Sequence, residues 1–190
     1  MQSPDRAAAL RGALDSHRND ASPFYDEVVS EVSRRADTSG SIGKAEIGAL
    51  VLWKRLNAST PWAAELMETP ENAVRAATAE ARQVALDEDQ DVPSAARQAR
   101  GALSSLPGFG VGDALASAVI HALAPHRMAV YDRRAQLGLE RLGLELTAKA
   151  GRYGRYMALV EQLIADAKGA GTELSAREVD LALYTLGAPR

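Results

Sequence analysis

Two features of the sequence combine residue types and a spacing that could do chemistry. One is a glycine-rich turn at residues 106–112, and the other is Asp132, twenty residues after Gly112. Glycine adopts positive φ without steric cost and lets backbone N–H groups approach a phosphate oxygen. The first N–H groups of a following helix would attract the same anion. The turn therefore predicts a helical hairpin that holds a nucleic-acid backbone, although such a turn also occurs as a plain connection between helices.

The side chains in and near this turn would have different tasks. Leu106 and Phe109 are apolar and would pack beneath the turn. The backbone N–H groups of the turn would bind the sugar–phosphate backbone and would not read the base sequence. Two arginines directly after Asp132 could hold flanking phosphates, or one of them could pair with Glu140. The candidate DNA-binding residues are Leu106, Pro107, Gly108, Phe109, Gly110, Gly112, Arg133 and Arg134.

Asp132 is the candidate catalytic residue. Cleavage of an N-glycosidic bond places positive charge on the sugar, and a nearby carboxylate stabilises that charge or activates a water molecule. Asp132 also begins a predicted helix, where the helix dipole and N–H groups favour the ionised carboxylate. An aspartate that only caps its helix has the same pattern. The hairpin upstream favours the catalytic role.

The stretch from Leu106 to Ala114 resembles the hairpin of the helix-hairpin-helix DNA glycosylase superfamily, which includes endonuclease III and 8-oxoguanine glycosylases. In that superfamily a helix, a short apolar segment and an invariant aspartate follow the hairpin, and residues 128–132 look similar to that segment. The resemblance covers about residues 100–145. Residues 52–55 and 177–184 look similar to flanking helices of little-characterised bacterial members. The resemblance implies an all-α, two-lobed fold with an active-site cleft between the lobes. It also implies double-stranded DNA with a flipped base as the partner.

Position 112 departs from the family pattern. Bifunctional members carry a lysine at the matching position, where it forms a Schiff base with the sugar. This chain has Gly112 there, so the resemblance predicts a monofunctional glycosylase without lyase activity. The chain has only four lysines. Lys54 could reach the site from another helix, but a lysine on a helix surface is more often solvated or paired with an acid.

Five residues are candidates for a pocket that holds the flipped base by stacking and edge contacts. Tyr131 directly precedes the candidate catalytic residue. Trp53 and Lys54 are included because of the resemblance. Asp180 and Tyr184 are four residues apart and would share one helix face. Each of these residues could instead belong to the core.

The composition limits the cofactors and the location. The chain has no cysteine, which excludes disulfides, thiolate zinc sites and a cysteine-ligated iron–sulfur cluster. The three histidines lack a metal-ligand spacing, so we expect no metal site and no cofactor, although a monovalent cation at the hairpin is compatible with the sequence. No signal peptide or membrane-spanning stretch is visible, and we expect a cytoplasmic protein without membrane contact. The net charge is −3, but residues 101–160 contain seven Lys/Arg and four Asp/Glu, which is compatible with a phosphate-facing surface.

The elements that must position these residues are predicted to be helices. Hydrophobic residues make up 46% of the chain, many of them Ala and Leu, and Ser/Thr-Pro pairs indicate several helix starts. One unit, 1–190, would contain lobes at about 38–100 and 101–145, with 1–37 and 146–190 packed around them. The expected helices are about 4–17, 23–35, 41–56, 61–68, 70–87, 93–104, 112–123, 132–142, 151–168 and 175–186.

The leading functional hypothesis is a monofunctional DNA glycosylase of base-excision repair, which hydrolyses the N-glycosidic bond of a damaged or modified base. The alternative is a non-catalytic helix-hairpin-helix DNA-binding protein, favoured by the missing lysine and the acidic net charge. A helical interaction domain that contacts no DNA is a third hypothesis. The sequence leaves open which base is excised and which oligomeric state the protein adopts.

Overall fold

The computed structural model of the protein describes residues 3–189, and their side chains from residue 5 onward. Within this range it contains ten helices and no strand, which confirms the all-α prediction. The helices are α1 (Ser3–Asp20), α2 (Glu27–Ser39), α3 (Lys44–Trp53), α4 (Pro61–Glu68), α5 (Glu71–Leu86), α6 (Val92–Ala102), α7 (Ala114–Leu123), α8 (Arg133–Arg141), α9 (Arg152–Gly169) and α10 (Ala176–Leu186).

Local capping signals explain why several helices begin where predicted. Asp132 precedes α8, and its Oδ1 accepts a hydrogen bond from the Ala135 N–H at 2.8 Å, which confirms the predicted cap. Ser175 and Glu178 form the predicted capping box of α10. In this box the Ser175 Oγ accepts from the Glu178 N–H, and the Glu178 carboxylate accepts from the Ser175 N–H. These side chains satisfy N–H groups that the first helical turn leaves unpaired.

The predicted start of α2 at Pro23 is wrong. Residues 23–26 form turns instead, and α2 begins at Glu27. Contacts with a distant residue stabilise these turns, since the Tyr25 hydroxyl donates to the Trp53 carbonyl and the Trp53 indole N–H donates to Asp26. The end of α2 also lies later than predicted, at Ser39, because Gly40 follows it in the left-handed conformation with φ 73°.

Two predicted boundaries around α3 and one before α7 also differ from the structure. The N-cap of α3 is Gly43, not Ser41, and the Gly43 N–H donates to the carboxylate of Glu46. The helix ends at Trp53 because Arg55 adopts a positive φ of 52°, which an α-helix does not allow. Helix α7 begins at Ala114, two residues after the predicted start at Gly112.

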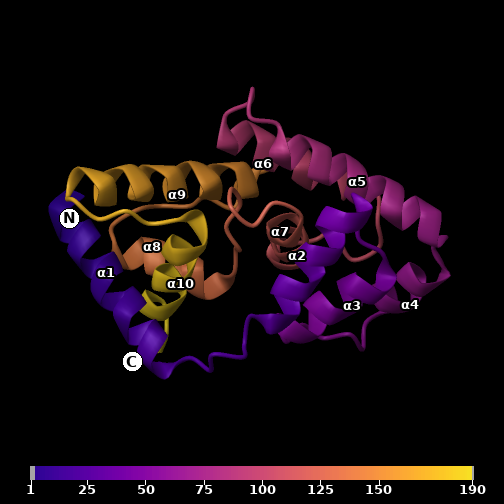
Figure 1. The fold of residues 1–190 in the computed structure, drawn as a ribbon, viewed down its shortest axis with the longest axis horizontal. Coiled ribbons are helices and arrows are strands. Elements are labelled where there is room, and N and C mark those ends of the chain that lie inside the picture. Colours follow the sequence, from indigo (N-terminus) through magenta and orange to yellow (C-terminus); the bar gives the residue numbers. More distant parts are fainter. Residues whose placement is uncertain (1–2, 190) are drawn as a thin grey trace.

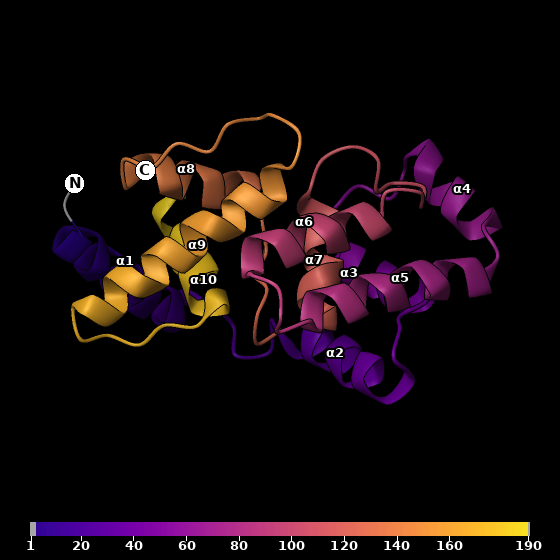
Figure 2. The same ribbon diagram turned by 90° about the horizontal axis from the view of Figure 1, so that it is seen from above.

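The helices form two groups (Figure 1). Helices α1, α8, α9 and α10 gather at one end, where α10 packs against α1, α8 and α9. Helices α2–α7 make up the rest, with α7 packed against α2, α3, α5 and α6. Helix α6 lies beside α9 where the groups meet (Figure 2). Of the two helices in residues 101–145, α7 packs against α2, α3, α5 and α6, and α8 packs against α10.

The buried apolar residues form one connected cluster that includes residues of both groups. Its largest fully buried side chains include Tyr153, Tyr156 and Phe109. No helix within residues 3–189 has the length and apolar composition needed to cross a membrane.

Candidate active site

A cavity of about 410 Å³ lies at the C-terminal ends of α1 and α3, beside the N-terminus of α8 and along α10. Five of the residues singled out in the sequence line it, namely Trp53, Lys54, Asp132, Asp180 and Tyr184. They come from three segments that are far apart in the sequence, so the fold brings them together. The lining is completed by His17, Asp20, Ala21, Ser22, Tyr25, Arg55, Val130, Arg177, Leu181, Thr185 and Ala188.

Asp132 and Lys54 form an ion pair on the wall of this cavity. The Lys54 Nζ lies 3.0 Å from the Asp132 Oδ2, while the other carboxylate oxygen caps α8. Only 11% of the Lys54 side chain and 21% of the Asp132 side chain are exposed to solvent. Charged side chains are seldom so well covered unless they are paired. Both oxygens of Asp132 are therefore held, and the carboxylate has a fixed orientation toward the cavity.

Helix α7 holds the segment that leads to Asp132. The Ser117 hydroxyl accepts a hydrogen bond from the Tyr131 N–H at 2.9 Å and donates to the Tyr131 carbonyl at 3.2 Å. The His121 Nδ1 lies 2.7 Å from the Met128 carbonyl oxygen. Burial, followed by the positive charge of Arg177, lowers the pKa of His121 to about 4. The imidazole is therefore neutral near pH 7, and its Nδ1 carries the proton that this contact requires.

Helices α9 and α10 hold the same segment from other sides. The Tyr153 hydroxyl donates to the Ala129 carbonyl at 2.8 Å, and the Tyr156 hydroxyl donates to the Val130 carbonyl at 3.1 Å. Burial raises the pKa of both tyrosines well above the ordinary value, so both remain donors. The Asp180 Oδ2 accepts from the Val130 N–H at 2.8 Å. Together with Ser117, these hydrogen bonds satisfy buried backbone groups and fix the approach to α8.

A chain of charges forms part of the cavity wall and continues behind it. The Arg177 guanidinium donates to the Asp180 Oδ1 at 2.7 Å and to both oxygens of Asp26 at 3.0–3.1 Å. It also lies 5.3 Å from the centroid of the Trp53 ring, whose indole N–H donates to Asp26. Burial raises the pKa of Asp180 to about 6, against the opposing effects of Arg177 and the Val130 N–H. The network fixes the Trp53 ring and places a second carboxylate beside Asp132.

Aromatic rings form much of the cavity wall. Trp53 and Tyr25 lie with their ring centroids 6.2 Å apart, and Tyr184 is on the opposite helix α10. The Arg134 guanidinium lies 4.8 Å from the Tyr184 ring centroid and donates to its hydroxyl at 2.7 Å. A guanidinium therefore covers one face of Trp53 and one face of Tyr184. Rings held in this way are suited to stack a planar ligand on a remaining face.

Tyr131 does not line the cavity, which corrects its assignment to the base pocket. It is buried beside Tyr156, with ring centroids 5.4 Å apart, and the Arg152 guanidinium lies 4.8 Å over its ring. Its hydroxyl donates to Gln136. The cause is the extended backbone before α8, in which successive side chains point to opposite sides. Because Asp132 faces the cavity, its neighbour Tyr131 faces away.

The glycine-rich turn connects α6 to α7 across residues 103–113. Leu106 and Phe109 are buried beneath it, so only their backbone atoms could contact a ligand. Gly108 has φ 87°, and a Cβ added there would lie 2.4 Å from the Trp62 ring. Gly112 has φ 75° and faces open space. Both the backbone angle and the close ring therefore require glycine at position 108, whereas only the backbone angle does so at Gly112.

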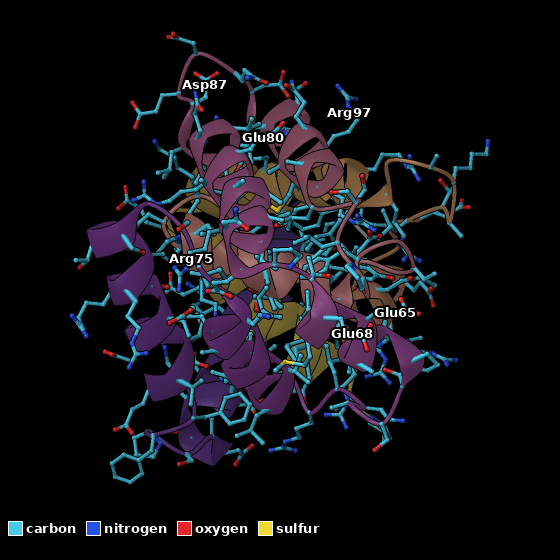
Figure 3. The ribbon with its side chains drawn as sticks, turned by 90° about the vertical axis from the view of Figure 1, so that its right-hand side faces the viewer. Glu65, Glu68, Arg75, Glu80, Asp87 and Arg97 are labelled. Atoms are coloured by element: carbon cyan, nitrogen blue, oxygen red, sulfur yellow. The ribbon has the colours of Figure 1, made fainter. Side chains whose placement is uncertain are left out.

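The two sides of this turn differ in charge. On one side a hollow is lined by Trp62, Glu65, residues 104–108, Gly110 and Val111. On the other side Arg97, Arg100 and Arg152 line a hollow of about 330 Å³ that includes two turn glycines and the first residues of α9. Figure 3 shows Arg97 well apart from Glu65 and Glu68 of α4.

Ion pairs fix the position of the turn relative to α6 and α9. Asp113 accepts from Arg100 at 2.9 Å and from Arg152 at 2.8 Å, and Arg100 also donates to the Gly112 carbonyl. Arg133 and Arg134 are exposed, and Arg134 pairs with Tyr184, not with Glu140. Within the described part of the chain, the N–H groups of Gly110 and Gly112 donate to no backbone acceptor.

Comparison of the chain with protein-family models, curated proteins and solved structures found no match. Sequence reasoning missed Arg177, Tyr25 and the residues that hold the segment before Asp132. The sequence does contain a signal for two of the residues that hold this segment. Ser117 and His121 are polar residues four positions apart in the otherwise apolar α7, and such a pair marks one buried polar face.

Proposed function

We propose that the protein is a DNA N-glycosylase that hydrolyses the bond between a flipped base and its sugar. The observation that carries this proposal is the Asp132 carboxylate on the wall of an aromatic cavity of about 410 Å³. Cavities of this size are typical of small-molecule sites. Trp53 and Tyr184 would stack against the base, and no sequence-specific contact is needed to hold it.

The carboxylate would act on the sugar as the bond breaks. The electron pair of the C1′–N bond leaves with the base, which takes up a proton, and a water oxygen bonds to C1′. Positive charge develops on the sugar during this step, and the negative charge of Asp132 would stabilise it. A preorganised charge is effective because it needs no rearrangement during the reaction. The hydrogen bonds that the preceding segment makes with Ser117, Tyr156 and Asp180 would supply that preorganisation.

The phosphate backbone would bind at the α6–α7 turn, from the side of Arg97. The N–H groups of Gly110 and Gly112 lie close to the arginine-lined hollow, and Glu65 lies on the other side. Backbone N–H groups and arginines both favour phosphate oxygens. We further propose that the two helix groups act as the lobes of a glycosylase-like fold, with the cavity as the cleft between them. A monovalent cation at the turn stays a prediction.

Asp132→Asn separates catalysis from folding. Asparagine can keep the cap of α8 through its Oδ1, since Asn and Asp cap helices about equally well. It removes the negative charge. We expect the rate of base excision from duplexes with single damaged bases, measured after alkali cleavage, to fall by about 100-fold or more, with unchanged affinity for duplex DNA. Excision at the wild-type rate by Asp132→Asn would refute the catalytic role.

A non-catalytic DNA-binding protein is the second candidate. It is favoured by the complete pairing of Asp132, whose two oxygens already bond Lys54 and the Ala135 N–H as in a purely structural residue. Wild-type protein that binds duplex DNA with a strong dependence on salt, yet excises no base from a broad panel of lesions, would support this candidate.

A further inference from the structure

Lys54 differs from the other lysines of the chain. Its side chain is 89% covered, faces the cavity and pairs with Asp132. Lys149 and Lys168 are exposed. Lys44 is bound to two backbone carbonyls near the end of α4. A lysine amine enclosed next to a carboxylate in a ligand-sized cavity is the arrangement that carbonyl chemistry uses, because the carboxylate can take and return a proton.

We propose that Lys54 is a nucleophile that forms an imine with the aldehyde of an abasic site, which gives the protein a strand-cleaving lyase activity. This inference rests on the proposed function, because the abasic sugar is the product that base excision leaves in the cavity. It replaces the expectation from Gly112 that lyase activity is absent. The amine would reach the sugar from the end of α3, and not from the hairpin, where the family carries its lysine.

The atoms of this reaction balance without a further reactant. Lys54 begins as an ammonium and gives one proton to Asp132, and the free amine adds to C1′ of the ring-opened sugar to form a carbinolamine. Asp132 returns the proton to the carbinolamine hydroxyl, which leaves as water and generates a protonated imine. The carboxylate of Asp132, which is ionised again, takes a proton from C2′ and later passes it to solvent. The electron pair of the C2′–H bond forms a C2′–C3′ double bond, and the C3′–O bond breaks, which releases the phosphate-terminated strand. Water finally hydrolyses the imine and restores the amine.

The position of the pair suits this sequence of proton transfers. The Lys54 Nζ and the Asp132 Oδ2 are 3.0 Å apart, so a proton can pass directly between them. The Asp132 Oδ1 stays bonded to the Ala135 N–H, which keeps the carboxylate in place when the amine moves to the sugar. Lys54 follows the last residue of α3, where its backbone N–H still donates to the Leu50 carbonyl, so the stem of the side chain is fixed.

The test uses the full chain and a duplex with one abasic site, so that no base excision is required. Borohydride delivers hydride to the imine carbon and converts the imine into a stable secondary amine. We expect a covalent protein–DNA adduct whose DNA-linked peptide contains Lys54. Lys54→Arg keeps a cation that can pair with Asp132 but cannot form the imine, and we expect it to lose the adduct. Lys44→Arg is the matched control and should form as much adduct as the wild type.

Three results would overturn the inference. They are no wild-type adduct at saturating abasic DNA, an adduct of wild-type yield with Lys54→Arg, and an adduct that maps to another amine. Circular dichroism melting of each variant shows whether Lys54→Arg is folded, and the adduct site mapped in the wild type decides the matter if it is not. Excision from lesion-bearing DNA is measured separately. A protein that forms the Lys54 adduct but excises no base would refute the proposed glycosylase activity and leave the lyase intact.

Discussion

The three glycines of the α6–α7 turn should respond to alanine in a fixed order, because the structure gives each one different constraints. Gly108 has φ 87° and its Cβ would lie 2.4 Å from the Trp62 ring. Gly112 has φ 75° with nothing within 4 Å. Gly110 has open space and, within the described residues, is not among the glycines with positive φ. The three positions therefore separate backbone strain from steric overlap.

The expected losses follow from these constraints. A left-handed backbone costs an alanine about 1–2 kcal/mol, and overlap with a packed ring adds about 1–3 kcal/mol. Gly108→Ala should therefore lower the free energy of unfolding by about 2–5 kcal/mol, Gly112→Ala by about 1–2 kcal/mol, and Gly110→Ala by less than about 0.5 kcal/mol. Urea unfolding at pH 7 measures all three.

A double variant isolates the steric share of this loss. In a Trp62→Leu background the ring is gone, and Gly108→Ala should then cost about 1–3 kcal/mol less than in the wild type. The reasoning is refuted if Gly108→Ala is no more destabilising than Gly110→Ala, or if the Trp62 background leaves its cost unchanged. Because Gly110→Ala keeps the fold, it also tests the turn as a phosphate site. The added methyl group would keep a phosphate away from the backbone N–H groups of the turn. We therefore expect the affinity of Gly110→Ala for duplex DNA to fall by about 10–100-fold through lost hydrogen bonds to phosphate.

Three further predictions concern stability. Burial lowers the pKa of His121 from 6.5 to about 4. Its contribution to the free energy of unfolding, about 3 kcal/mol, is therefore complete above pH 6.5 and disappears as pH falls toward 4. Burial raises the pKa of Asp180 from 3.8 to about 6, so its contribution of about 3 kcal/mol is complete below pH 3.8 and disappears as pH rises toward 6. Because the two oppose each other, urea unfolding from pH 7 to 4 should show stability rising on acidification in His121→Asn and falling in Asp180→Asn, relative to the wild type. Tyr156→Phe leaves the Val130 carbonyl without its donor and should cost about 1–3 kcal/mol, whereas an unchanged urea midpoint would contradict the role of this hydrogen bond. Gly138→Ala should lower the melting temperature, because its Cβ would lie 2.2 Å from a backbone oxygen of α10 and such overlap costs about 1–3 kcal/mol.

The parts of the fold that the sequence predicts well are those with local causes. Ser175 and Asp132 begin helices because each side chain bonds an N–H group three residues later. The start of α2 is different, because Tyr25 and Asp26 bond Trp53, which lies 27–28 residues away. No local pattern indicates these bonds, and the Ser-Pro pair at 22–23 points to an earlier start. Tertiary hydrogen bonds override the local preference here.

The candidate site shows the same division between local and distant causes. Asp180 lies among apolar neighbours on the buried face of α10, and a charged residue in such a position signals a specific partner. That signal identifies the residue but not its partners, Arg177 and the Val130 N–H. Tyr131 and Asp132 are adjacent in sequence yet face opposite sides. Adjacency was the reason to place Tyr131 in the pocket, and the alternation of an extended backbone is the reason it lies elsewhere.

Stability alone does not account for the ion pair between Lys54 and Asp132. Removing two charges from water costs about as much as their attraction returns, so a well-packed apolar pair would stabilise the fold as well or better. The protein nevertheless places both charges on a cavity wall and directs side chains from α7, α9 and α10 to the four residues that precede Asp132. Several hydrogen bonds that fix the position of one carboxylate are expected where that position matters for chemistry. These contacts support the proposed site, in which a fixed amine and a fixed carboxylate would face a ligand, over a salt bridge that only joins two helices.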